Sequence, residues 1–353
     1  MHFFTLWNHD NSIINKYYEQ YLGQLHSIIS PLHISQTIFP SDFLGIPDIA
    51  TTIEWYKNRK ISEMKVREFL LKEWTFFSSY KPHEMFSAYW SLIHGTDIRL
   101  TMTDANPDNQ NKNHPDHQES GVGIGWGTMP EPEWLSLYTR SFAILRDISP
   151  GLFHELTQMI KKIIPMGVSH RIHNSASYDS CIGHLYMSYP TGIDHPELAV
   201  LEAIIHESNH NKLNLVMKSD ILILNTREEV YYSPYRPDTR HIHGIYLGLH
   251  ALVAVLSVFI TAHRTSTYTL PDSWLEKMII YHMKNALSIK VLEKYRRFTP
   301  LGDTIFEEMQ TVQRETNLHI QGLSVPQDTM LRARDAVRGH FSQVQTAYSN
   351  LRY

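Results

Sequence analysis

Residues 194–217 read DHPELAVLEAIIHESNHNKLNLVM and contain the motif His-Glu-x-x-His at 206–210. Asp194, Pro196 and Glu197 are typical of a helix start, because proline suits the first turn and acids suit the positive end of the helix dipole. The sequence therefore predicts one helix that carries the motif in its middle. Its apolar face, at helical spacing, is formed by Leu198, Leu201, Ile204 and Ile205.

The two histidines of the motif are the first candidate ligands. Residues four apart on a helix lie one turn above each other, so the imidazoles of His206 and His210 point the same way. Such a pair is the two-histidine part of many metal sites. Because the chain contains 22 histidines, a chance match is the competing explanation. The clearly marked helix favours a metal site, with Glu207 as a catalytic candidate.

Composition places the chain among ordinary globular proteins. It has 353 residues, 42% hydrophobic and 19% charged, enough for one large domain or two. The net charge of -4 gives no reason to expect nucleic acid or an acidic membrane as a partner. Cys181 is the single cysteine, which excludes an internal disulfide and a thiolate metal cluster.

The sequence shows no targeting signal that we recognise. Residues 1–4 are not followed by the basic and apolar regions of a signal peptide. The longest apolar run, 251–262, is shorter than a bilayer-spanning helix and predicts a buried core helix. We therefore expect a soluble, cytoplasmic protein that does not span a membrane.

The expected fold is α+β, mainly helical, with a small antiparallel sheet beside the motif helix. Two strands, at 168–173 and 182–189, are expected to form a hairpin just before that helix. We expect a helical N-terminal region at 1–165, with a polar loop at 104–120, and a metal-binding catalytic region with C-terminal helices at 166–353.

A working metal site needs a third protein ligand, and the residues leave two alternatives. The metzincin pattern is excluded, because Leu213 and Val216 stand where it requires glycine and histidine. A zinc peptidase would take a downstream glutamate, Glu228 or Glu229. Its zinc would lower the pKa of a bound water, and Glu207 would act as general base.

The other alternative is a third imidazole from His250, in the apolar helix expected at 242–263. Three histidines would then surround a redox-active iron, whereas iron oxygenases usually use two histidines and a carboxylate. A buried core histidine is the competing explanation for His250 taken by itself.

Four blocks of sequence together carry a resemblance. They are Asn-Ser-Ala-Ser at 174–177, the motif followed by Lys-Leu at 212–213, Tyr-Tyr-Ser-Pro-Tyr-Arg-Pro-Asp-x-Arg at 231–240, and Gly-Ile-Tyr-Leu-Gly-Leu-His-Ala-Leu at 244–252. In combination they resemble the HExxH peptide-modification family, which is found beside ribosomally made peptide natural products. The resemblance covers roughly residues 170–260.

The resemblance implies an Fe(II)- and 2-oxoglutarate-dependent oxygenase that hydroxylates a side-chain carbon, often a β carbon, of a precursor peptide or amino acid. His206 and His210 would be iron ligands, and His250 would be the third. Arg236 or Arg240 would pair with the distal carboxylate of 2-oxoglutarate, since a planar guanidinium suits bidentate binding. Tyr235 stands where the family is expected to have tryptophan, and Glu207 would orient a ligand or water. The zinc metallopeptidase, or a binding protein without turnover, stays as an alternative.

Overall fold

The computed structural model describes residues 12–32, 44, 47–79, 91–102, 104, 124–323 and 325–348. The chain is mainly helical (64%) with a five-stranded mixed sheet, so the expected α+β class is confirmed. Of the polar loop expected at 104–120, all but Asp104 lies outside the described residues.

The described residues form two compact units. We call 12–145 with 153–219 the motif unit, and 146–152 with 220–348 the helical unit. Each unit is described by itself below. Whether the expected regions 1–165 and 166–353 fold as separate domains stays a prediction.

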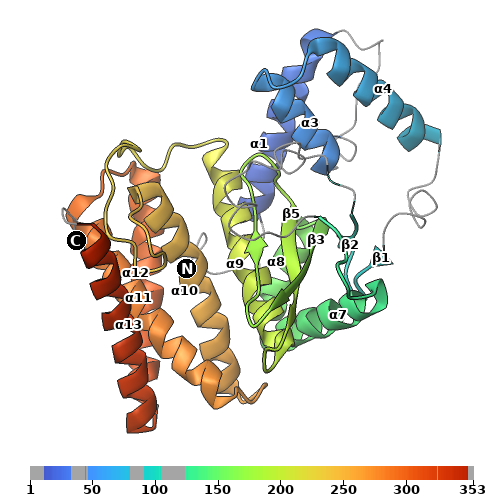
Figure 1. Cartoon of the computed structure of the whole chain (residues 1–353). Coiled ribbons are helices and arrows are strands. Elements are labelled where there is room, and N and C mark those ends of the chain that lie inside the picture. Colours follow the sequence, from blue (N-terminus) through green and yellow to red (C-terminus); the bar gives the residue numbers. More distant parts are fainter. Residues whose placement is uncertain are drawn as a thin grey trace. The chain divides into compact units, whose positions relative to one another are not determined.

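The motif unit combines helices with the sheet, and α9 carries the His-Glu-x-x-His motif. Helix α9 packs against strands β5 and β4, and α1 packs against α3 and α9 (Figure 1). The end of α7 and the start of α8 are counted in the helical unit. The helices are α1 Ser12–Ile29, η1 Ser30–Leu32, α3 Pro47–Lys57, α4 Glu63–Ser79, α7 Glu131–Ile148, α8 Pro150–Met159 and α9 Pro196–Met217.

The sheet has the order β1-β2-β3-β5-β4. Strands β1–β2 and β4–β5 pair antiparallel, whereas β2–β3 and β3–β5 pair parallel. The strands are β1 Ser91–Leu92, β2 Arg99–Leu100, β3 Lys162–His170, β4 Ser175–Ala176 and β5 His184–Thr191.

The sheet is therefore mixed and not antiparallel throughout, and the hairpin expected from 168–173 and 182–189 is wrong. After β3 the chain forms β4 on the far edge of β5 and then returns along β5, so β3 and β5 run in the same direction. The connection 171–183 has the length that a parallel crossover needs.

The helical unit consists of four long helices after a looped segment. Helix α11 packs against α10, α12 and α13, and the helices lie side by side in Figure 1. They are α10 Ile242–Thr265, α11 Asp272–Tyr295, α12 Pro300–Gln321 and α13 Gln327–Ala347.

The apolar run 251–262 is too short to span a bilayer. Helix α10, which contains this run, is longer. Among the described helices it alone is long and apolar enough to cross a membrane by length and composition. However, 78% of its most apolar stretch is buried, as in the core helix of a soluble protein. This helix by itself is therefore weak evidence for or against a membrane span.

Candidate metal site

Helix α9 begins where the sequence predicts it. Pro196 lies in its first turn, after His195, whose φ of 59° places it in the left-handed region. The predicted apolar face is buried, but burial extends around the helix and includes polar side chains. From 203 to 216 every residue is buried except His206 and His210, which are half-buried.

The two imidazoles face one another. Nε2 of His206 and Nε2 of His210 are 2.9 Å apart, and the ring planes are perpendicular, at 90°. Metal–nitrogen bonds are about 2.0–2.1 Å long, so two nitrogens at this separation can reach one cation. The residues present therefore fit the two-histidine part of a metal site.

Glu207 is turned toward the sheet and is held by two serines. Ser175 Oγ donates to its Oε1 at 2.8 Å, and Ser177 Oγ donates to its Oε2 at 2.6 Å. The side chain is buried, with 5% of its surface exposed. Both carboxylate oxygens therefore serve to join the segment around β4 to α9. Both serines belong to the block at 174–177 that carries the resemblance, but no local pattern predicts their contact with Glu207.

Two further polar residues of α9, Asn211 and Lys212, join it to other elements. Asn211 Oδ1 accepts from the Gly183 backbone N–H at 2.8 Å, and its Nδ2 donates to the His184 carbonyl at 3.2 Å, which joins α9 to the start of β5. Lys212 Nζ lies 2.8 Å from Glu155 Oε1 of α8, and these side chains are 2% and 3% exposed. Sequence reasoning missed these contacts, although polar residues inside a helix expected to be buried were a signal.

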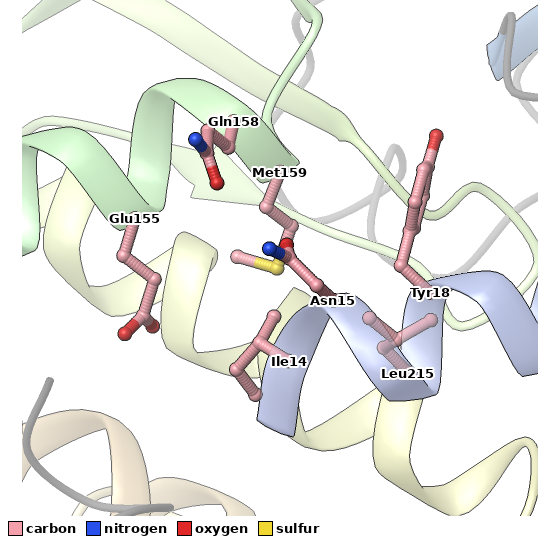
Figure 2. Close-up of a pocket in the computed structure, with 7 residues that line it drawn as sticks. All are labelled: Ile14, Asn15, Tyr18, Glu155, Gln158, Met159 and Leu215. Carbon is pink, nitrogen blue, oxygen red and sulfur yellow. The ribbon is translucent and has the colours of Figure 1, made fainter. Parts of the chain in front are cut away.

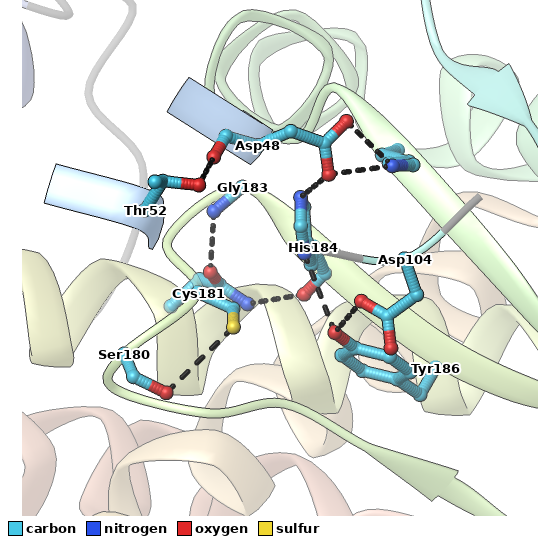
Figure 3. Close-up of polar contacts among 10 residues, drawn as sticks. Asp48, Thr52, Asp104, Ser180, Cys181, Gly183, His184 and Tyr186 are labelled. Carbon is cyan, nitrogen blue, oxygen red and sulfur yellow. Dashed lines mark hydrogen bonds and ion pairs between the residues drawn. The ribbon is translucent and has the colours of Figure 1, made fainter. Parts of the chain in front are cut away.

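A polar network supports β5 on the side of α3 (Figure 3). Lys162 Nζ donates to both carboxylate oxygens of Asp48, at 2.9 and 2.8 Å. His184 is fully buried beside this pair, and burial, with the Lys162 charge, lowers its pKa to about 3. Tyr186 donates its hydroxyl to Asp104 at 2.9 Å. These contacts hold the strand on which the motif helix rests.

A pocket in the motif unit lies among α1, α8 and α9 (Figure 2). Glu155 links it to Lys212, but the motif histidines do not line it. Its lining residues are Ile14, Asn15, Tyr18, Glu155, Gln158, Met159 and Leu215.

The two arginines proposed for 2-oxoglutarate belong to the helical unit and meet at one carboxylate. Arg236 Nε lies 3.5 Å from Asp238 Oδ1, and Arg240 Nε lies 2.9 Å from Oδ2. We call residues 231–240 the arginine loop. Its ends are joined by two backbone hydrogen bonds between Tyr231 and Arg240, of 2.8 and 2.9 Å. The shared carboxylate of Asp238 was not among the predicted site residues, and the role of either arginine toward 2-oxoglutarate stays a prediction.

The candidates for a third ligand also belong to the helical unit. His250 is fully buried in α10. Glu228 is exposed, and Glu229 Oε2 accepts from the Tyr231 hydroxyl at 3.0 Å and lies 3.5 Å from Arg297. Within the described part of the chain, no three histidine, cysteine or acidic side chains gather as a metal cluster. The third ligand therefore stays a prediction.

Comparison of the chain with protein-family models and with curated proteins finds no match.

Proposed function

We propose that this protein is an Fe(II)- and 2-oxoglutarate-dependent oxygenase that hydroxylates a side-chain carbon of a peptide or amino acid, with a β carbon as the first expectation. The observation that carries the proposal is the pair of imidazole nitrogens of His206 and His210, 2.9 Å apart on adjacent turns of α9. The resemblance of residues 170–260 to the HExxH peptide-modification family supplies the choice of iron and 2-oxoglutarate.

Each residue has one task in this proposal. His206 and His210 hold the iron, with His250 as the third ligand. Arg236 or Arg240 binds the distal carboxylate of 2-oxoglutarate, and Asp238 orients both guanidinium groups until that acid arrives. The chemistry that iron and 2-oxoglutarate supply together is dioxygen-dependent hydroxylation of a carbon, with release of succinate and carbon dioxide.

The contacts of Glu207 favour this function over a zinc peptidase. A general base in a peptidase needs a carboxylate oxygen within reach of the metal-bound water. Here Ser175 and Ser177 engage both oxygens of Glu207. That arrangement suits a residue that positions β4 against the metal helix. Residues around metal ligands commonly have such an orienting role.

Cellular context belongs to the proposal as well. We propose a cytoplasmic enzyme that meets its peptide or amino-acid substrate there and uses neither nucleic acid nor a membrane. A short precursor-peptide gene beside the gene for this protein would identify the substrate class.

Metal content provides the first test. The chain is purified without added metal, and iron and zinc are measured in the wild type, His206→Ala, His210→Ala and the control His154→Ala. His154 is an exposed histidine of the same unit. We expect iron in the wild type and the control and its loss in the two motif variants. Zinc in place of iron, or equal metal in all four proteins, would contradict the proposal.

Turnover provides the second test. With iron, dioxygen and 2-oxoglutarate, the wild type should release succinate and carbon dioxide, and His206→Ala should not. Hydrolysis of a peptide without any need for 2-oxoglutarate would instead establish the peptidase alternative.

A further inference from the structure

The C-terminal helix α13 reaches the arginine loop through one histidine. His340 Nδ1 lies 3.1 Å from the Tyr232 hydroxyl, and His340 Nε2 lies 3.0 Å from the Arg236 carbonyl oxygen. The ring of Tyr232 also packs edge-on against Phe341 of α13. Helix α13 lies outside residues 170–260, the part of the chain that carries the family resemblance.

The two contacts define one protonation state of His340. A carbonyl oxygen can only accept, so Nε2 must carry the hydrogen that it donates to Arg236. In the neutral ring Nδ1 then has a lone pair, which accepts the hydroxyl hydrogen of Tyr232. A second proton on Nδ1 would reverse this bond: the Tyr232 oxygen would accept from Nδ1, and the hydroxyl hydrogen would lose this acceptor. The bridge between Tyr232 and Arg236 is therefore complete in the neutral form.

The charges near His340 favour this neutral form. Partial burial and the Lys284 cation of α11 lower its pKa, and the hydrogen bond to the Arg236 carbonyl opposes them. Tyr232 is the titratable group that faces it from the loop, and burial raises the pKa of that hydroxyl to about 12. Tyr232 thus keeps its hydroxyl hydrogen throughout the range in which His340 titrates.

Other contacts hold the rest of the arginine loop, so the contribution of His340 is confined to the backbone at Arg236. The Tyr231–Arg240 hydrogen bonds join the two ends of the loop. Tyr235 donates its hydroxyl to Asn285 of α11 at 2.8 Å. The contact at the Arg236 carbonyl lies between these points, and it sets the backbone from which the Arg236 guanidinium extends.

We propose that His340 is a positioning residue for 2-oxoglutarate: by bridging Tyr232 and the Arg236 carbonyl it holds the arginine loop in the conformation that receives the distal carboxylate. The inference rests on the proposed function for the identity of the acid. It assigns to the C-terminal helix a part in cofactor binding, and it makes affinity for 2-oxoglutarate depend on neutral His340.

Calorimetry of 2-oxoglutarate binding to the iron-loaded full chain under argon tests this. His340→Leu removes both contacts and should weaken binding 10- to 100-fold, the usual effect of losing a supporting partner. His340→Gln should restore binding to within about threefold of wild type, because its amide can accept from Tyr232 and donate to Arg236. The matched control is His319→Leu in α12, another half-buried histidine whose pKa is lowered by burial. It should bind like wild type.

A pH series separates positioning from general stability. Wild-type affinity should fall as the pH drops through the pKa of His340, which lies below the ordinary histidine value of about 6.5, whereas His340→Gln should lack that part of the dependence. Amide hydrogen exchange at residues 232–238 gives a readout without cofactor, and it should rise in His340→Leu and not in His319→Leu.

Three outcomes would overturn the inference. These are wild-type affinity in His340→Leu, failure of His340→Gln to recover binding, and a pH dependence that His340→Gln retains in full. If the wild-type chain does not bind 2-oxoglutarate, the proposed function fails, and the cofactor part of this inference fails with it. Hydrogen exchange then still decides whether His340 holds the loop.

Discussion

Glu207 differs from its two histidine neighbours in what surrounds it. His206 and His210 are half-buried and face each other, whereas Glu207 is buried against β4 and accepts from Ser175 and Ser177. Helical periodicity predicts the pairing of the histidines from sequence alone. It does not predict the serines, because their approach depends on how the strand returns to the helix.

The first prediction concerns Glu207. Glutamine can accept from one serine and donate to the other, so Glu207→Gln should keep succinate formation within about threefold of wild type. Succinate formation should fall about 10- to 100-fold in Glu207→Ala and in the double variant Ser175→Ala/Ser177→Ala. This is the usual effect of losing a partner that supports a metal ligand. A loss of succinate formation of about 100-fold or more in Glu207→Gln would contradict this positioning role. If the wild type instead cleaves a peptide and Glu207→Gln abolishes that cleavage, Glu207 is a general base.

The second prediction concerns the buried ion pair of Lys212 and Glu155. Lys212→Met leaves a buried carboxylate without its cation, so the free energy of unfolding should fall by about 3–5 kcal/mol. The double variant Lys212→Met/Glu155→Leu removes both charges and should recover most of that loss. Urea denaturation at pH 7 measures both effects. A double variant less stable than the single one would contradict the explanation by burial.

At the scale of elements, helices were predictable and the direction of strands was not. The start of α9 follows from its proline and acidic residues, and the existence of α10 follows from its apolar run. The parallel pairing of β3 with β5 depends on the two-residue strand β4 crossing to the far edge. So short a strand leaves no periodic pattern in the sequence, and a hairpin was the simpler expectation.

The third prediction concerns α10, which contains Gly244 and Gly248. A Cβ at Gly248 would lie 2.8 Å from Cδ2 of Tyr235, which is half-buried and whose hydroxyl is bonded to Asn285. Gly248→Ala should therefore lower the free energy of unfolding by about 1–3 kcal/mol through overpacking.

Gly244 supplies the matched control in the same helix. A Cβ there would meet its nearest neighbours, in Arg240 and His241, at 3.6 Å, which is ordinary contact. Gly244→Ala should leave stability unchanged or raise it by up to about 1 kcal/mol, because alanine favours helix. Chemical denaturation compares the two variants, and equal effects would show that Tyr235 does not confine position 248.

For the whole molecule, the division into two units limits what a motif can predict. His206 and His210 belong to one unit, and His250 and the arginine loop belong to the other. Spacing along one helix predicts a two-histidine pair, because the helix itself sets the geometry. A ligand from another unit depends on how distant segments fold together, and no local pattern encodes that distance.

The last prediction is acid sensitivity arising from the fully buried His184 and the half-buried His243. Burial lowers the pKa of His184 to about 3 and of His243 to about 4. In the unfolded chain both should titrate near about 6.5, so the unfolded state binds more protons below that value. The contribution of these two neutral histidines to the free energy of unfolding is therefore complete above about pH 6.5. It declines as the pH falls toward their pKa values in the folded chain.

Proton uptake by His184 in the unfolded chain should by itself lower the free energy of unfolding by about 1 kcal/mol between about pH 6.5 and 5.5. Most carboxylates stay ionised in this range. Urea denaturation across this range measures it, with His184→Gln as the variant that lacks the titrating ring. The variant should be less stable at pH 7.5 but should show a flatter pH dependence. An equally steep decline in His184→Gln would assign the acid sensitivity to other groups, since the substituted side chain cannot take up a proton in this range.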